Sequence, residues 1–196
     1  MSEEMLVCHC SPTLAGLKTG SLFSCPYSSQ KMIIKEIREF NQKLTQKGIR
    51  IIPVRISDKR MLVYVYRPEK LKEDFSDEKT QIILKCKGYD CTNLSQCICR
   101  LIQKLQSDPD FPHEIGLFLG YPAEDVKGFI ENKAACSKCS GCWKVYGDEQ
   151  AARILFKKYK KCTEIYCRRW KSGVAVEQLT ICLLYTSPSP RDMRRS

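Results

Sequence analysis

The sequence predicts an α+β fold in which a small, mainly antiparallel sheet packs against several helices. Segments with helical periodicity make up most of the chain, and two runs rich in β-branched and aromatic residues form a predicted hairpin at 49–67. A third, shorter run near 143–147 offers a further strand. Because no linker rich in Gly, Ser or Pro divides the chain, we expect residues 1–181 to form one domain.

The first predicted helix spans residues 30–47. Its apolar residues recur every three or four positions, and Gly48 is the residue type that commonly follows a helix C-terminus. The apolar stripe consists of Ile33, Ile37, Phe40 and Leu44. The same periodicity predicts three more helices at 69–74, 77–86 and 93–106. Asn93 is placed to cap the last of these helices.

The predicted hairpin joins the runs GIRIIPVRI and RMLVYVYR through the polar residues 57–59. Proline has no backbone N–H, so Pro53 should place its strand at a sheet edge or at a bulge. The run WKVYG at 143–147 is expected to extend this hairpin to a third strand. The predicted sheet is therefore small and antiparallel.

Between the hairpin and the C-terminus, glycine and proline again mark the predicted boundaries. Pro112 and Pro122 stand at first-turn positions with Gly120 between them, which predicts two short helices; a strand at 115–119 is the alternative. Asp148 is expected to cap a further helix. The inner stripe of that helix consists of Ala152, Leu155, Phe156 and Tyr159. Separate helical segments are predicted near 163–170 and from Gly173 onward.

Composition restricts the compartment and the kind of partner. No apolar run approaches the roughly 20 residues that a membrane-spanning helix needs, and the N-terminus MSEEMLVCHC is acidic, whereas a secretory signal begins with basic residues. We therefore expect a cytoplasmic protein without membrane association, whose 13 cysteines are reduced thiols. The net charge of +11 favours a polyanionic partner such as nucleic acid.

The most distinctive chemical feature is the CxxCxxC pattern of Cys136, Cys139 and Cys142. Thiolates at this spacing can converge on one ion, and a fourth ligand would complete a zinc site or an iron–sulfur cluster with a regulatory or redox role. Cys10 is the fourth ligand that we expect. The other candidates are Cys8, Cys162 and Cys167. In the alternative interpretation the first two cysteines lie in a surface loop and Cys142 packs as a small apolar residue.

A thiol enzyme is a second hypothesis. Its nucleophile would be Cys10, and its base would be His9 or His113, the two histidines of the chain. In the alternative, Cys10 is buried and His9 forms hydrogen bonds near the chain start. The segment HEIGL lacks the second histidine of a zincin helix, and neither GxGxxG nor a phosphate-binding loop occurs. The sequence therefore assigns no reaction.

A basic stretch at 157–170 supports nucleic-acid binding as a third hypothesis, because cations hold phosphates and aromatic rings stack on bases. The residues concerned are Lys157, Lys158, Lys160, Lys161, Arg168 and Arg169 with Tyr159 and Trp170. In the alternative, these cations form the solvent-exposed face of a helix. The protein would then be a protein-interaction module with structural cysteines.

Four motifs together resemble a family of small proteins of unknown function, DUF3793, from clostridial and other anaerobic bacteria. They are HCSPTLAGLKTGSLF, RMLVYVYR, FPHEIGLFLGYPAEDVKGFIEN and CSGCWKVYGDEQAA. The resemblance extends from Val7 to about Ile181. It implies bacterial origin and a single domain, and it brings no reaction, cofactor or catalytic residue.

The C-terminus differs in character from the rest of the chain. Residues 182–192, CLLYTSPSPRD, look like one translated frame of an adapter used in shotgun library preparation. We therefore expect 182–196 to be a disordered tail foreign to the native protein. The native domain would continue past Ile181 into sequence that this chain lacks.

Overall fold

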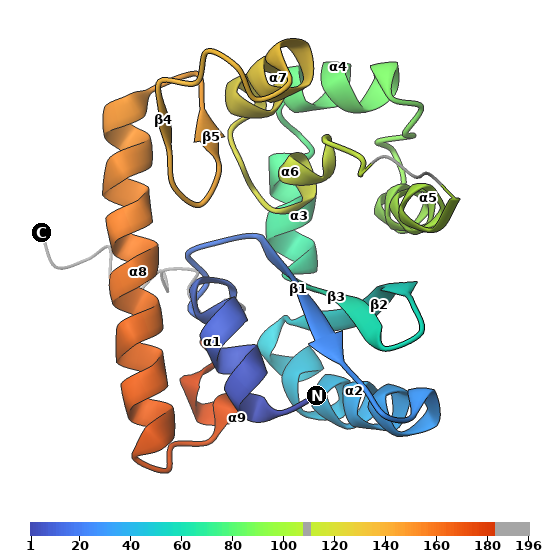
Figure 1. Cartoon of the computed structure of the whole chain (residues 1–196), viewed down its shortest axis with the longest axis vertical. Coiled ribbons are helices and arrows are strands. Elements are labelled where there is room, and N and C mark those ends of the chain that lie inside the picture. Colours follow the sequence, from blue (N-terminus) through green and yellow to red (C-terminus); the bar gives the residue numbers. More distant parts are fainter. Residues whose placement is uncertain (108–110, 183–196) are drawn as a thin grey trace, which may run out of the picture.

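The computed structural model describes residues 1–107 and 111–182 of the chain. Figure 1 shows the helices and strands, coloured along the sequence from the N-terminus to the C-terminus. The helices are α1 (Glu3–Leu14), α2 (Gln30–Leu44), the 3-10 helix η1 (Thr45–Lys47), α3 (Pro68–Asp74), α4 (Glu78–Cys86), α5 (Leu94–Ser107), α6 (Ile115–Phe118), α7 (Ala123–Asn132), α8 (Glu149–Lys171) and α9 (Val176–Leu179). The strands are β1 (Gly20–Pro26), β2 (Arg50–Ile56), β3 (Arg60–Tyr66), β4 (Cys139–Ser140) and β5 (Lys144–Val145). The predicted α+β fold is confirmed.

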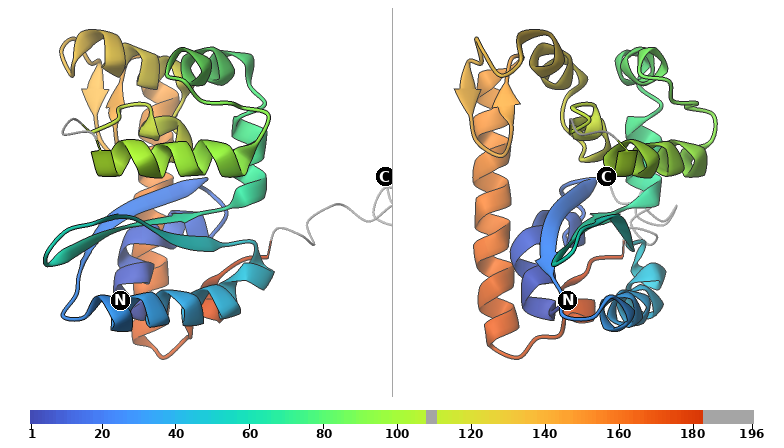
Figure 2. Two further views of the ribbon diagram at one scale, coloured as in Figure 1. Left: turned by 90° about the vertical axis from the view of Figure 1, so that its right-hand side faces the viewer. Right: turned by 45° about the vertical axis from the view of Figure 1, so that its right-hand side comes forward.

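The central sheet has three antiparallel strands in the order β1-β3-β2. Alternation along β3 sends Met61, Val63 and Val65 into one core and Tyr64 and Tyr66 into another. The first core also contains side chains of α1, α2, α8 and α9, and the second contains side chains of α3 to α7. Helices therefore cover both faces of the sheet (Figure 2).

The predicted hairpin is confirmed as β2 and β3. β2 is an edge strand, and its register shifts between Pro53 and Arg55, so the proline stands both at an edge and at an irregularity, as expected. The predicted helices from 30 to 106 also form, and Gly48 follows η1 with a left-handed φ of 74°. Asn93 Oδ1 accepts a hydrogen bond from the backbone N–H of Gln96.

The prediction that 143–147 adds a third strand to this hairpin was wrong. The third strand is β1, whereas β5 pairs with β4 in a separate two-stranded sheet. Sequence patterning missed β1 because serines and a cysteine interrupt its apolar residues, and it missed α1, which contains Pro12 near its C-terminus. Both elements are stabilised by packing on distant segments.

The C-terminal half confirms two short helices, α6 and α7, and not the alternative strand at 115–119. The prediction of a separate helix near 163–170 was wrong, since α8 runs without a break through that region. The helix expected from Gly173 is reduced to the four residues of α9. The tail expected at 182–196 lies, except for Cys182, outside the described residues.

Arg67 anchors the C-terminal segment to the rest of the fold. Its side chain is buried, with 2% exposed, and its guanidinium donates hydrogen bonds to backbone carbonyls from three parts of the chain. These acceptors are Thr13 O, Leu14 O, Lys47 O and Ile181 O.

Within residues 1–107 and 111–182, none of the helices has the length and apolar character needed to cross a membrane.

Candidate functional site

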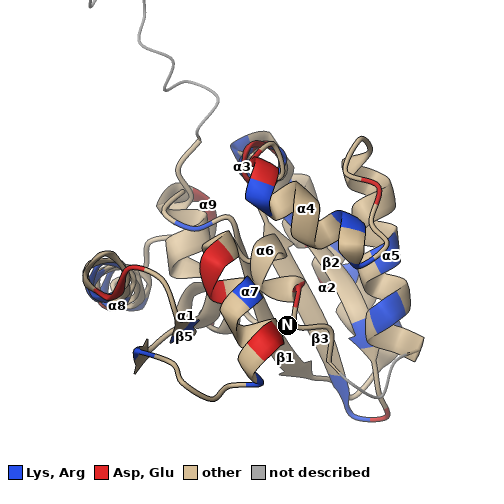
Figure 3. Ribbon diagram, turned by 90° about the horizontal axis from the view of Figure 1, so that it is seen from above, with Lys and Arg blue, Asp and Glu red and all other residues tan. Residues whose placement is uncertain are grey.

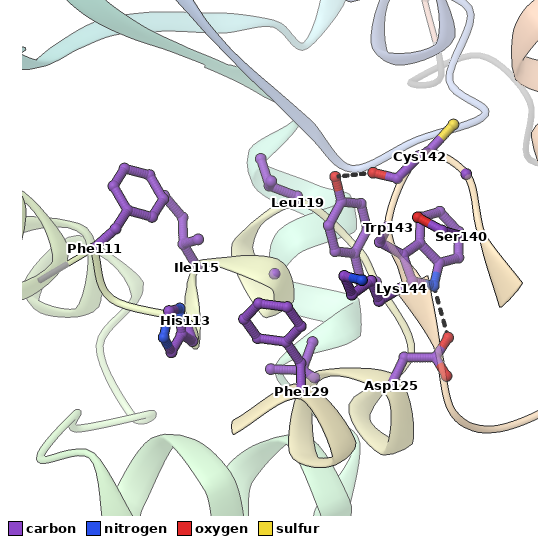
Figure 4. Close-up of a pocket in the computed structure, with 14 residues that line it drawn as sticks. Phe111, His113, Ile115, Leu119, Asp125, Phe129, Ser140, Cys142, Trp143 and Lys144 are labelled. Atoms are coloured by element: carbon purple, nitrogen blue, oxygen red, sulfur yellow. Dashed lines mark hydrogen bonds between the residues drawn. The ribbon is translucent and has the colours of Figure 1, made fainter. Parts of the chain in front are cut away.

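A cavity of about 360 Å³ lies between the helical segment α6–α7 and the β4–β5 hairpin. Figure 4 shows the two walls facing each other. The helical wall consists of Phe111, His113, Ile115, Gly116, Leu119, Tyr121, Asp125, Val126 and Phe129, and the hairpin wall consists of Ser140, Gly141, Cys142, Trp143 and Lys144. We call this cavity the aromatic pocket.

Two glycines shape the helical wall. Gly120 has a left-handed φ of 76°, which lets the chain turn sharply between α6 and α7. Gly116 allows close packing, because a Cβ there would lie 2.7 Å from Cγ2 of Val126. The sequence prediction of a glycine turn at this point is thus confirmed, and the turn directs Tyr121 into the pocket.

Asp125 joins the two walls. Its carboxylate is buried, and it accepts a hydrogen bond from Trp143 Nε1–H at 2.7 Å. Its other oxygen accepts the backbone N–H groups of Tyr146 at 2.7 Å and Gly147 at 2.8 Å. These three hydrogen bonds offset the free-energy cost of burying the carboxylate. Because one of them comes from the indole N–H, they also hold the Trp143 ring in one orientation against the cavity.

The inner end of the pocket is a stack of aromatic rings. The ring of Trp143 stacks on Tyr121 with centroids 4.5 Å apart, and it forms a T-shaped pair with Phe156, with centroids 4.6 Å apart. The amino group of Lys18 lies 5.1 Å from the centre of the Tyr121 ring. Burial raises the pKa of Tyr121 to about 12, and the nearby Cys142 thiol adds to this shift. The phenol is therefore neutral at physiological pH.

Polar groups gather at the rim. His113 is exposed and meets Phe129 edge to face at 4.9 Å, while Ser140 and Cys142 are exposed on the hairpin. Lys144 is half-buried and forms no ion pair with the described residues. The site is consequently apolar inside, with a cation and an imidazole at its edge.

The CxxCxxC thiols lie on and beside the same hairpin. Cys136 is exposed with a left-handed φ of 56°, Cys139 is half-buried in β4, and Cys142 lies in the turn between β4 and β5. In the described part of the chain, no three or more His, Cys, Asp or Glu side chains are grouped so as to hold a metal ion. The metal site stays a prediction.

Cys10 is fully buried in α1, where burial raises the pKa of its thiol. A protonated thiol in this position is a poor ligand and a poor nucleophile. Neither histidine forms a hydrogen bond with it in the described residues: His9 stacks on Phe23 at 5.0 Å, and His113 lies at the rim of the pocket. Among the described residues, the structure thus shows no hydrogen-bonded pair of Cys10 and a histidine that would support the thiol-enzyme hypothesis.

The basic stretch forms part of α8, on which Figure 3 marks Lys and Arg positions in blue. All six cations of the stretch are exposed. Its aromatic residues are less exposed than its cations. Tyr159 is buried, and half-buried Trp170 donates a hydrogen bond from Nε1–H to Glu3 Oε2 at 3.3 Å. The exposed surface of this stretch is therefore mainly basic, and nucleic-acid binding stays a prediction.

Sequence reasoning missed the pocket, although its walls come from two of the quoted motifs, FPHEIGLFLGYPAEDVKGFIEN and CSGCWKVYGDEQAA. A family model described as a protein of unknown function (DUF3793) matches residues 6–180. The chain belongs to this family. No curated protein and no solved structure matches it. Within this DUF3793 member, the two motifs meet across the aromatic pocket.

Proposed function

We propose that this protein binds a small, flat, largely apolar molecule in the aromatic pocket. The observation that carries the proposal is a cavity of about 360 Å³ lined chiefly by apolar and aromatic side chains. Cavities of roughly 300–1,000 Å³ with this lining are typical of small-molecule sites. The buried Asp125 holds Trp143 in place before any ligand arrives, which reduces the entropy lost on binding.

The polar residues at the edge of the pocket favour a ligand that carries a negatively charged group. Lys144 brings a cation that has no carboxylate partner in the described residues, and His113 adds a hydrogen-bond donor or acceptor. The proposed ligand class is therefore an aromatic acid, with its ring against Trp143 and its anionic group toward Lys144. This assignment is one of binding and includes no reaction.

Titration with 1-anilinonaphthalene-8-sulfonate tests the proposal, because this probe combines flat apolar rings with an anionic group. We expect saturable binding that changes the fluorescence of Trp143, with Trp170, the other tryptophan, as an internal reference. Ser140→Tyr, which fills the pocket from its exposed wall, should abolish this binding. Ala135→Tyr, in the neighbouring loop and outside the lining, is the matched control. Equal binding by both variants would refute the proposal.

The charge at the rim has its own test. Lys144→Gln should weaken binding of the anionic probe about fivefold, the effect of ~1 kcal/mol expected for a solvent-accessible ion pair. Binding of an uncharged naphthalene should not change. A loss of affinity for both probes would show that the substitution distorts the hairpin, and no loss for either would place the anionic group elsewhere.

A second candidate function is metal binding by Cys136, Cys139 and Cys142, as zinc or as an iron–sulfur cluster. The supporting observation is that all three are free thiols on one short segment around the β4–β5 hairpin, two of them exposed. The burial of Cys10 counts against its expected role as fourth ligand.

Metal and acid-labile sulfide analysis of protein purified without oxygen tests this candidate. Cys139→Ser should lose the metal, since a hydroxyl is a poor ligand for a soft ion. Cys99→Ser, an exposed cysteine on α5, should retain it and serves as the control. Stoichiometric metal in the Cys139 variant, or none in the parent protein, would exclude this site.

A further inference from the structure

Two thiols far apart in the sequence face each other between the first helix and the longest one. Cys8 Sγ of α1 lies 3.6 Å from Cys167 Sγ of α8, although 159 positions separate them in the chain. Cys8 is exposed and Cys167 is half-buried. The two helices run side by side in Figure 1, with Cys162 and Tyr166 of α8 buried in the same core as α1.

Contacts on both sides of the thiols fix the register of these helices. Toward the C-terminus of α8, Trp170 Nε1–H donates to Glu3 Oε2 at 3.3 Å. Toward its N-terminus, Tyr159 is buried, and its hydroxyl donates to the carbonyl of Leu17 at 3.4 Å. The sulfurs therefore need only a small side-chain movement to reach the ~2.05 Å of a disulfide bond.

We propose that Cys8 and Cys167 are a redox-sensitive pair that closes to an intramolecular disulfide on reaction with a small-molecule disulfide such as oxidised glutathione. The Cys8 thiolate attacks one sulfur of oxidised glutathione, forming a mixed disulfide and releasing one glutathione. The Cys167 thiolate then attacks the Cys8 sulfur and releases the second glutathione. Two protein thiols lose two electrons, one oxidised glutathione gains them, and the two thiol protons pass to the released glutathiones.

Accessibility assigns the order of these two steps. Cys8 is exposed, so the reagent reaches it first. Cys167 borders a surface groove of about 550 Å³, lined also by His9 and Lys160, which leaves room for the departing glutathione. Burial is the main cause that raises the pKa of Cys167, with the adjacent Cys8 contributing, so this thiol is less reactive toward a reagent in bulk solvent.

Peptide mapping of the whole folded chain tests the pair. After treatment with excess oxidised glutathione and alkylation of the remaining thiols, trypsin should yield peptide 1–18 linked to peptide 162–168. Fragmentation should place the bond at Cys8 and Cys167 and not at the buried Cys10 and Cys162 in the same peptides. A link that forms only after unfolding in urea would overturn the proposal.

Three serine variants separate the two steps. In Cys167→Ser, Cys8 should retain glutathione as a stable mixed disulfide, whereas in the parent protein this adduct should be transient. Cys8→Ser should form no link, and Cys99→Ser should behave as the parent does. A stable adduct on Cys8 in the parent protein would show that Cys167 does not act on it.

A second measurement does not depend on the variants. Oxidation should raise the thermal midpoint of the parent protein, because the bridge restricts the unfolded chain across a long loop. The reductant dithiothreitol should reverse this shift. An oxidised parent protein that melts at the same temperature as the reduced one, with no link in its peptide map, would contradict the pair.

Discussion

A single carboxylate, that of Asp125, connects the helical wall of the aromatic pocket to its hairpin wall. Asp125→Ala would remove the acceptor of the buried indole N–H and of two part-buried backbone N–H groups. We expect a loss of about 2–4 kcal/mol in the free energy of unfolding, measured by urea denaturation. Asp125→Asn keeps one acceptor oxygen and should lose less. Unchanged stability of the alanine variant would show that the hairpin is held by other contacts.

Glu114, also at the residue scale, makes stability depend on pH. Burial by itself would raise the pKa of Glu114, but hydrogen bonds from Lys104 at 2.7 Å and from Tyr89 at 3.1 Å outweigh it and lower the pKa below 4.5. An acid with a lowered folded pKa stabilises the protein above its unfolded pKa, and this contribution disappears as pH falls through the folded value.

We therefore expect the free energy of unfolding to decrease as the pH falls below about 4.5, followed by urea denaturation across the acidic range. Glu114→Gln should be less stable at neutral pH and should show a shallower decrease in acid. The same slope in both proteins would mean that other carboxyl groups cause it. Sequence patterning could not indicate these hydrogen bonds, because the partners of Glu114 come from α5 and from the segment before it.

At the scale of an element, α8 presents cations outward and buries Tyr159 and Tyr166. Since Tyr159 and Tyr166 are buried and Trp170 is half-buried, we expect any oligonucleotide binding to be weak and to act mainly through phosphates. Anisotropy of a labelled single strand should then show an affinity that drops steeply with salt. Reversing Lys157, Lys158, Lys160 and Lys161 to glutamate should abolish it. Binding that is insensitive to salt would contradict this account.

At the scale of the whole molecule, Arg67 and Ile181 tie the C-terminal segment to α1. The carbonyl of Ile181 accepts from Arg67 at 2.7 Å, and its N–H donates to Leu14 O at 3.1 Å. Truncation after Cys182 should leave the thermal midpoint unchanged, because both bonds are kept. Truncation after Thr180 should lower it, since the guanidinium loses one acceptor. Equal midpoints for both truncated chains would show that Ile181 adds nothing.

Local patterning predicted much of the fold for a physical reason: amphipathic periodicity records which side of each segment is buried. The helix from residue 30, the hairpin of β2 and β3, the bulge at Pro53 and the glycine turn at Gly120 all follow from residues close in sequence. The sequence did not predict β1, because its pairing with β3 and its burial depend on partners about 40 positions away. The sequence likewise named Cys136, Cys139 and Cys142 but not their arrangement.

The sequence alone thus determined the α+β class, most of the helices and the membership implied by the motifs. Only the tertiary structure decided that two of those motifs meet to form the aromatic pocket, and that Cys8 lies against Cys167. It also decided that Cys10 is fully buried. The reason is that hydrophobic patterning specifies which face of an element turns inward, whereas the partner across that face is chosen by packing among segments distant in sequence.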